Sequence, residues 1–169
     1  MTNKLPITFQ GQPNEFWCWA AVASMVSVFH QSDDRPALSQ CQVATETLNL
    51  PDCCGSALTP DQCLQLWDLC DALQSIGFKA QSNWNADLSI VSQEIENNRV
   101  LAALMYYKRS GILHYILVNG YDDTSGQESV YIADPAAQPC SMPWEIFLAN
   151  YNYHDGDSAV WKQWILITS

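Results

Sequence analysis

The chain has 169 residues, the size of one ordinary domain, and 48% of them are hydrophobic, which is enough to bury a substantial core. Its formal net charge of −11 argues against nucleic acid as a partner, because phosphate binding needs a basic surface. No apolar run approaches the length of a membrane span, so no membrane association is expected. The absence of repeats, low-complexity tracts and linkers predicts a single domain over residues 1–169.

The first half of the sequence is dominated by helical patterns. Residues after Cys18 recur at the three- and four-residue spacings of one helix face: Ala21, Met25, Val28 and Phe29. A short helix is expected near residues 39–48. Thr59-Pro60-Asp61-Gln62 is typical of a helix start, and this helix should run to Gly77. A further helix is expected from about residue 87 to residue 97.

The second half changes to β-rich patterns. Three apolar runs separated by turn residues predict strands at 100–107, 114–121 and 129–134. A short helix is expected from Ser141, and the final run VWKQWILIT predicts a closing strand. Helices followed by an antiparallel sheet indicate an α+β protein, with a helical half at about 1–98 and a sheet half at about 99–169. A cleft is expected between the halves.

The seven cysteines are many for a protein of the reducing cytosol. Without Cys18, six remain, enough for three disulfides whose connectivity the sequence leaves open: Cys41, Cys53, Cys54, Cys63, Cys70 and Cys140. Zinc binding is the competing interpretation, but the spacing lacks the CxxC pairs of zinc sites, so no metal is expected.

The cysteine content favours a secreted or exported protein over a cytoplasmic one. The first residues, MTNKLPITFQ, show no apolar segment of the signal-peptide kind. Export without a cleaved signal, or a trimmed form, is therefore the expectation, with a cytoplasmic protein as the alternative.

Cys18 lies in the segment QPNEFWCWAA, where a polar loop becomes a helix. It is a buried packing residue, half of a disulfide, or a nucleophile. Local context alone favours packing, because cysteine is among the most buried residue types. The first backbone N–H groups of a helix, however, stabilise a thiolate, so the position also suits a nucleophile if a histidine lies nearby.

Only one of the three histidines is suited to act beside Cys18. His30 lies roughly three helical turns away, and His154 lies in the polar stretch NYHDGDS. His114 opens an apolar strand directly after a turn at Gly111. His114 is therefore the candidate partner, although a lone histidine at a strand end is more often structural or solvated.

The hairpin after His114 adds a carboxylate. If its turn centres on Thr124, Ile116 pairs with Ile132 and His114 pairs with Asp134, with both side chains on one face. A slip of one residue would move Asp134 to the opposite face. An aspartate in this place can orient an imidazole and stabilise its charged form, whereas Asp134-Pro135 can also simply end the strand.

Gln12 lies six residues before Cys18 and completes the candidate set. Acyl transfer needs hydrogen-bond donors aimed at the developing oxyanion, and a side-chain amide can supply one beside the backbone N–H of Cys18. A glutamine in a loop is not by itself evidence for an oxyanion hole. Gln12 is a candidate only because Cys18, His114 and Asp134 are also present.

These residues together resemble the bacterial papain-like cysteine peptidases, and most closely the group of plant-pathogen effector peptidases and bacteriocin-leader peptidases of ABC exporters. The likeness rests on Gln12-x5-Cys18-Trp19-Ala20-Ala21, on His114 in a strand ending with Gly120-Tyr121, and on Asp134-Pro135. It extends over nearly the whole chain through Met25-Val26, Ser39-Gln40-Cys41, Cys53-Cys54 and EIENNRVLAAL.

The resemblance implies a papain-like fold with Cys18 as nucleophile at a helix start and His114 as general base and acid. It implies that Asp134 orients His114 and that Gln12 helps to form the oxyanion hole. A monomer that acts on a peptide or protein substrate without a cofactor is expected. By analogy, Trp19 packs behind the nucleophile, and Trp161 and Trp164 cover the histidine.

One departure concerns Leu113, because members of this group often have glycine immediately before the histidine. Leucine there is expected to narrow the cleft or to change which substrates enter it. Two other functions stay open: acyl or peptidyl transfer on the same site, and a non-catalytic peptide-binding module. All four expected positions carry residues that can act in catalysis, which argues against the non-catalytic peptide-binding module.

Overall fold

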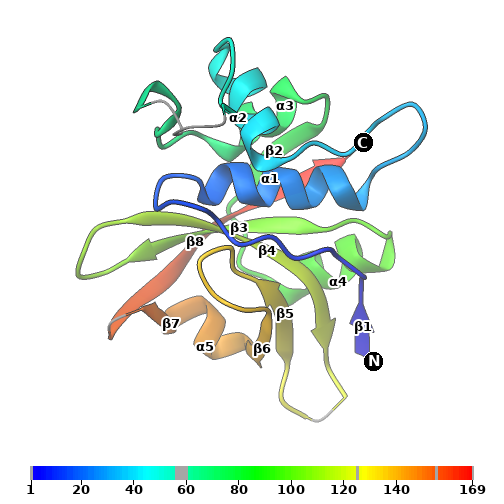
Figure 1. The fold of residues 1–169 in the computed structure, drawn as a ribbon. Helices are drawn as coiled ribbons and strands as arrows, with labels where there is room; N and C mark the ends of the chain where they lie inside the picture. Colours follow the sequence, from blue (N-terminus) through cyan, green and yellow to red (C-terminus); the bar gives the residue numbers. More distant parts are fainter. Residues whose placement is uncertain (1, 56–60, 125, 155, 169) are drawn as a thin grey trace.

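The chain folds into a helical layer and an antiparallel sheet, and helix α1 (Cys18–Phe29) forms the side of the helical layer that packs on the sheet (Figure 1). The structure, a computed structural model, describes residues 2–55, 61–124, 126–154 and 156–168. Helix α1 contacts α2, α3 and strand β4, and ten of its residues are buried. A helix enclosed on several sides must be apolar or small all round, as WAAVASMVSVF is.

The helical layer consists of α1, α2 (Gln40–Leu48), a 3₁₀ turn η1 (Asp61–Cys63) and α3 (Leu69–Ser75). Ser39 begins α2 with a capping box, in which its hydroxyl and the Gln42 side chain satisfy each other's backbone N–H groups. Asp68 caps α3 by accepting hydrogen bonds from the N–H groups of Cys70 and Asp71.

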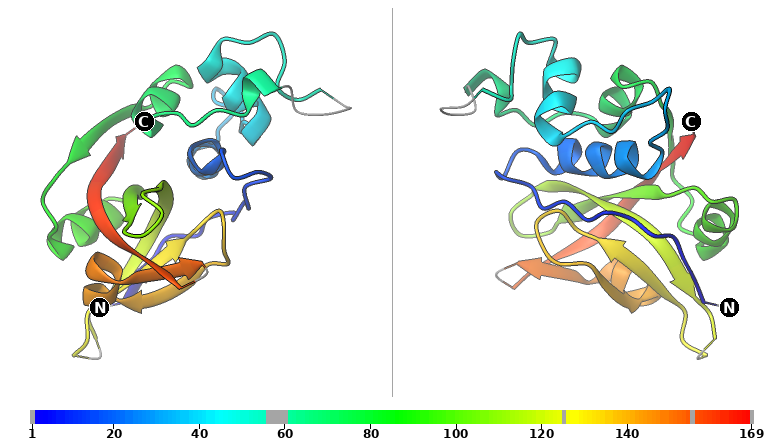
Figure 2. Two further views of the ribbon diagram at one scale, coloured as in Figure 1. Left: turned by 90° about the vertical axis from the view of Figure 1, so that its left-hand side faces the viewer. Right: turned by 45° about the vertical axis from the view of Figure 1, so that its right-hand side comes forward.

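Eight strands form one sheet of antiparallel pairs, in the order β2-β8-β3-β4-β5-β6, with β1 added to β4 and β7 added to β8. The strands are β1 (Thr2–Lys4), β2 (Lys79–Asn83), β3 (Leu101–Tyr107), β4 (Leu113–Asp122), β5 (Ser129–Ala133), β6 (Cys140–Pro143), β7 (Tyr151–His154) and β8 (Asp157–Thr168). The sheet curves strongly, as the left view of Figure 2 shows.

Two further helices pack against this sheet. Helix α4 (Leu88–Glu96) contacts β4, and α5 (Trp144–Ala149) contacts β8. The aromatic rings of Trp144 and Phe147 stack on Trp164, with ring centroids 5.9 and 5.7 Å apart. In Figures 1 and 2, α1 and α5 lie on opposite sides of β3 and β4.

The α+β class and most expected elements are confirmed, but the helix predicted from Thr59 to Gly77 is wrong over much of its length. Thr59 and Pro60 lie outside the described residues, residues 61–63 form only a 3₁₀ turn, and α3 begins at Leu69. The expected end at Gly77 is confirmed, with a left-handed φ of 88°.

Tertiary hydrogen bonds explain the missing turns of this helix. The indole N–H of Trp17 donates to the Cys63 carbonyl at 2.7 Å, and that of Trp19 donates to the Gln65 carbonyl at 2.8 Å. These two bonds tie the segment to α1 along a path in which residues 64–68 form neither helix nor strand. The Asp68 cap then starts a new helix.

The expected division at residue 98 is also too simple, because β1 and β2 come from the first half and join the sheet. Strand β1 crosses so close to β4 that a Cβ on Gly120 would lie 2.7 Å from the Asn3 carbonyl oxygen. Short polar strands such as β1, β2 and β7 lack the apolar alternation that sequence patterns detect. The helix expected from Ser141 begins only at Trp144, because β6 uses the preceding residues.

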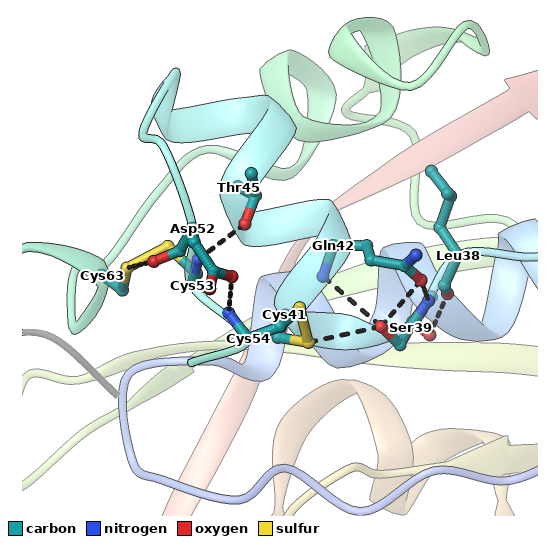
Figure 3. The surroundings of a disulfide bond; sticks show 10 residues. Leu38, Ser39, Cys41, Gln42, Thr45, Asp52, Cys53, Cys54 and Cys63 are labelled. Atoms are coloured by element: carbon teal, nitrogen blue, oxygen red, sulfur yellow. Dashed lines mark hydrogen bonds between the residues drawn. A yellow bond between two sulfur atoms is a disulfide. The ribbon is translucent and has the colours of Figure 1, made fainter. Parts of the chain in front are cut away.

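Two disulfides hold the segment after α2, as Figure 3 shows: Cys41–Cys54 and Cys53–Cys63. The Thr45 hydroxyl also accepts the Cys53 N–H at 2.8 Å. Each disulfide closes a short loop and contributes roughly 3 kcal/mol by limiting the unfolded chain. The presence of disulfides is confirmed, and the pairing that the sequence left open uses four of the six cysteines, while Cys70 and Cys140 are free thiols.

Candidate active site

Cys18 is the first residue of α1, and only 3% of its surface is exposed. It is not part of a disulfide. No side chain caps the start of this helix, because Trp17 occupies the capping position. The N–H groups of the first turn therefore have no side-chain acceptor from the capping position, and the positive end of the helix dipole favours negative charge near Cys18.

His114 lies in β4 with 7% of its surface exposed, and Asp134 follows β5 with 1% exposed. The Nε2 atom of His114 lies 2.7 Å from Oδ1 of Asp134. The same ring hydrogen-bonds the sulfur of Cys18. Because Nε2 is engaged by the carboxylate, Nδ1 is the ring nitrogen that remains for the sulfur. Cys18, His114 and Asp134 thus form one continuous, buried chain of polar contacts.

The surroundings of His114 favour its charged form. Burial by itself lowers the pKa of this imidazole, but the hydrogen bonds to Asp134 and Cys18 and the charge of Asp134 raise the pKa to about 10. The ring is therefore an imidazolium at neutral pH. An imidazolium beside a cysteine sulfur stabilises a thiolate and can later donate its proton.

The pairing of β4 with β5 differs from the predicted one but leaves the two side chains together. Val118 pairs with Ile132 and Leu117 with Ala133, so the direct pairing of His114 with Asp134 is wrong. The register is shifted by two residues relative to the prediction. Because an even shift preserves the face of each side chain, Asp134 remains on the His114 face and meets it diagonally.

Asp134 has two further hydrogen-bond donors. The N–H of Ala136 donates to Oδ1 at 2.8 Å, and the hydroxyl of Tyr151 donates to Oδ2. Tyr151 was not among the residues predicted from the sequence. It lies at the start of the short strand β7, and no local pattern connects it with Asp134.

Gln12 lies in the loop before α1, where two hydrogen bonds fix it. Its backbone N–H donates to the Pro135 carbonyl at 2.7 Å, which connects this loop to the residues after Asp134. Its side-chain Nε2 donates to the Asn14 carbonyl at 2.8 Å. An amide nitrogen carries two hydrogens, so the second is available for another acceptor.

A cavity of about 290 Å³ adjoins the sulfur of Cys18. Its lining is largely apolar and comes from both layers of the fold: Cys18, Trp19, Leu66, Trp67, Asp68, Leu113 and Tyr115. Leu113, with 51% of its surface exposed, lies on the wall of this cavity, where a larger side chain narrows the space. The cavity can therefore receive an apolar side chain beside the sulfur.

The tryptophans near the site have different positions. Trp19 is wholly buried, yet it contributes to the lining of the cavity beside Cys18, so it does more than pack behind the nucleophile. Trp161 in β8 and His114 in β4 are both cross-strand partners of Met105 in β3. Because directly paired residues share a face of the sheet, Trp161 lies on the same face as His114. Trp164 is wholly buried and stacks on Phe147.

Among the residues that the structure describes, no three His, Cys, Asp or Glu side chains are grouped so as to hold a metal ion. No helix in the same residues is long and apolar enough to cross a membrane.

A family profile described as papain-like cysteine protease AvrRpt2 matches residues 1–152. The chain belongs to this family. It is therefore a papain-like cysteine peptidase, a hydrolase, and the resemblance stated from its motifs is confirmed. No curated protein sequence matches this peptidase significantly.

The fold of the peptidase is similar to a solved structure, that of a double glycine motif protease from an AMS/PCAT transporter in complex with the leader peptide. The TM-score is 0.50, with 14% identity over 99% of this chain and 97% of the other. At this identity the likeness shows a shared fold, and the papain-like arrangement expected from the sequence is confirmed.

Proposed function

We propose that this peptidase cleaves peptide bonds with Cys18 as nucleophile, His114 as general base and acid, and Asp134 as the residue that orients His114. The observation that carries the proposal is the buried hydrogen-bond chain from the Cys18 sulfur through the His114 ring to Asp134. Nucleophile, base and orienting group are in mutual contact, as covalent catalysis requires.

The reaction follows from the charges of these groups. The Cys18 thiolate attacks the substrate carbonyl carbon, a C–S bond forms, and the carbonyl oxygen becomes an oxyanion. His114 then donates its proton to the leaving amine as the C–N bond breaks. In the second half, neutral His114 takes a proton from water, whose oxygen attacks the thioester and releases the acid product and the Cys18 sulfur.

We propose that the oxyanion is stabilised by the backbone N–H of Cys18 and by the side-chain amide of Gln12. The uncapped start of α1 supports the first donor. The two hydrogen bonds that fix Gln12 to Asn14 and Pro135 support the second, because a donor that is already held in place needs no reorganisation during the reaction.

A peptide or protein is the proposed substrate. The apolar cavity beside Cys18 supports this assignment, because it can hold one side chain of an extended chain next to the scissile bond. The solved peptidase of similar fold was crystallised with a leader peptide. The two disulfides support the further proposal that the protein works outside the reducing cytosol.

Cleavage of a peptide library tests the proposal. Wild type should cleave a subset of peptides, and Cys18→Ala and His114→Ala should cleave none. Cys70→Ser is the matched control, because Cys70 is a free cysteine that does not line the cavity. Equal cleavage by wild type and Cys18→Ala would contradict the assigned nucleophile, and inactivity of wild type on every peptide would contradict peptidase function on such substrates.

A further inference from the structure

We propose that Tyr151 is a positioning residue for catalysis, whose hydroxyl holds the Asp134 carboxylate in the orientation that presents Oδ1 to His114. The inference rests on the proposed roles of Cys18, His114 and Asp134. It begins with the observation that the two oxygens of Asp134 have separate tasks. Oδ1 accepts from His114 and from the Ala136 N–H, and Oδ2 accepts from the Tyr151 hydroxyl.

A carboxylate at the end of a strand can rotate about its Cβ–Cγ bond, because this torsion has a broad energy minimum. Donors on both oxygens remove that freedom. Without the Tyr151 hydroxyl, Oδ2 of Asp134 has no other donor among the described hydrogen bonds, while the carboxylate stays buried. Losing this bond therefore costs both a charge-assisted hydrogen bond and the fixed rotation.

Tyr151 is itself firmly held. It is 2% exposed, its backbone pairs with Ala159 of β8, and its ring lies edge-on to Phe147 with centroids 6.3 Å apart. A tyrosine side chain has only two side-chain torsions, and the burial and ring contact of Tyr151 restrict both, so its hydroxyl can move little. The donor is thus placed by the sheet and by α5, elements that do not carry Cys18.

The hydroxyl remains a donor over the whole working pH range. Burial and the negative charge of Asp134 raise the pKa of Tyr151 far above its ordinary value. The other titratable groups near it are Tyr107 and Cys140, and burial together with the charge of Asp134 raises the pKa of the Cys140 thiol. Cys140 therefore stays neutral, and Asp134 is the anion of this cluster.

Tyr151 acts on the reaction through His114. A fixed Asp134 keeps the imidazole aligned, so that its other nitrogen stays directed at Cys18 during both proton transfers. It also helps to hold the proton on His114, because the hydrogen bond to Asp134 is one cause of the raised pKa of the imidazole. A looser carboxylate should weaken both effects.

The test compares Tyr151→Phe with a matched control, Tyr121→Phe. Tyr121 is also buried in the sheet, and its hydroxyl also donates to a carboxylate, Glu96, at 2.6 Å, but it is not part of the site. For Tyr151→Phe we expect kcat to fall about tenfold with KM unchanged, and the alkaline limb of the pH–rate profile to move to lower pH. Tyr121→Phe should lose stability only.

A purely structural Tyr151 would give a different result: a loss of stability in Tyr151→Phe with kcat and pH profile as in wild type. That outcome would overturn the proposal, while an inactive Cys18→Ala in the same assay shows that the proposed function still holds. If Tyr151→Phe does not fold, 4-aminophenylalanine at position 151 keeps a weaker donor. An intermediate kcat and alkaline limb would then support the proposal, and wild-type values for both would overturn it.

Discussion

His114 and Asp134 meet diagonally across two neighbouring strands, with Nε2 and Oδ1 2.7 Å apart. This diagonal contact places an anion behind a buried imidazole whose other side contacts Cys18. Burying the two charges costs desolvation energy, and the hydrogen-bonded contact between them offsets that cost. Without the anion, an imidazolium at this buried position would be unpaired, so His114 should lose its proton at a lower pH than in the wild type.

Replacing Asp134 by asparagine tests the role of its charge. Asparagine retains an oxygen acceptor of the same shape, so alignment of His114 should partly survive, whereas alanine removes both acceptor and charge. We expect kcat to fall roughly tenfold for Asp134→Asn and roughly a hundredfold for Asp134→Ala. The alkaline limb should move to lower pH in Asp134→Asn, because one cause of the raised His114 pKa is lost. Equal kcat in the two variants would contradict an aligning role.

The pKa of His114 predicts how activity and stability change in alkaline solution. With a pKa of about 10, the proton needed by the leaving amine is present up to that pH, and kcat/KM should decline above it. The folded-state pKa lies above the unfolded value of 6.5, so this group's stabilisation is complete below pH 6.5 and is lost as pH rises through about 10. Urea unfolding as a function of pH measures the second effect, with His114→Gln as the control that should lack it.

The Cys53–Cys63 disulfide should affect substrate binding more than chemistry. Leu66 and Trp67, which follow Cys63 in the chain, form one wall of the cavity. The segment that leads to them is held by the disulfide at Cys63 and by hydrogen bonds from the indoles of Trp17 and Trp19. In Cys53→Ser/Cys63→Ser we expect KM to rise several-fold with a smaller change in kcat, and a loss of about 3 kcal/mol of stability. Steady-state kinetics and urea unfolding check this.

The matched control for that variant is Cys41→Ser/Cys54→Ser. It removes a disulfide of similar loop length, but neither cysteine directly precedes the cavity wall. A similar stability loss with an unchanged KM is expected. If both variants raised KM equally, the disulfides would be acting on the helical layer as a whole.

Leu113 should control which side chains enter the cavity. Its side chain contributes to the cavity wall, and Leu113→Ala removes most of it. We expect kcat/KM to rise several-fold for peptides with bulky apolar residues next to the scissile bond, relative to peptides with small ones. Ile112→Ala is the control, because Ile112 is similarly exposed but does not line the cavity. Unchanged selectivity in Leu113→Ala would show that the opposite wall decides specificity.

Much of the site follows from local patterns. The helix after Cys18 is encoded by its small and apolar residues, and Cys18 lies at the start of that helix, where the helix dipole favours negative charge. The strands around His114 and Asp134 are encoded by alternating and apolar runs, and their period of two determines which residues share a face. For this reason a register error of two residues left the predicted partners together.

Other features depend on contacts between distant segments. The hairpin register, the choice of two disulfides among six cysteines, and the loss of helix between Cys63 and Asp68 all result from tertiary pairing. The Tyr151 hydroxyl reaches Asp134 only because α5 and β7 pack back onto the sheet. Sequence alone thus determined which residue types are candidates for the proposed reaction and which faces they share, since these follow from short-range patterns. The tertiary structure decided which further groups hold them, because burial and long-range hydrogen bonds have no local signal.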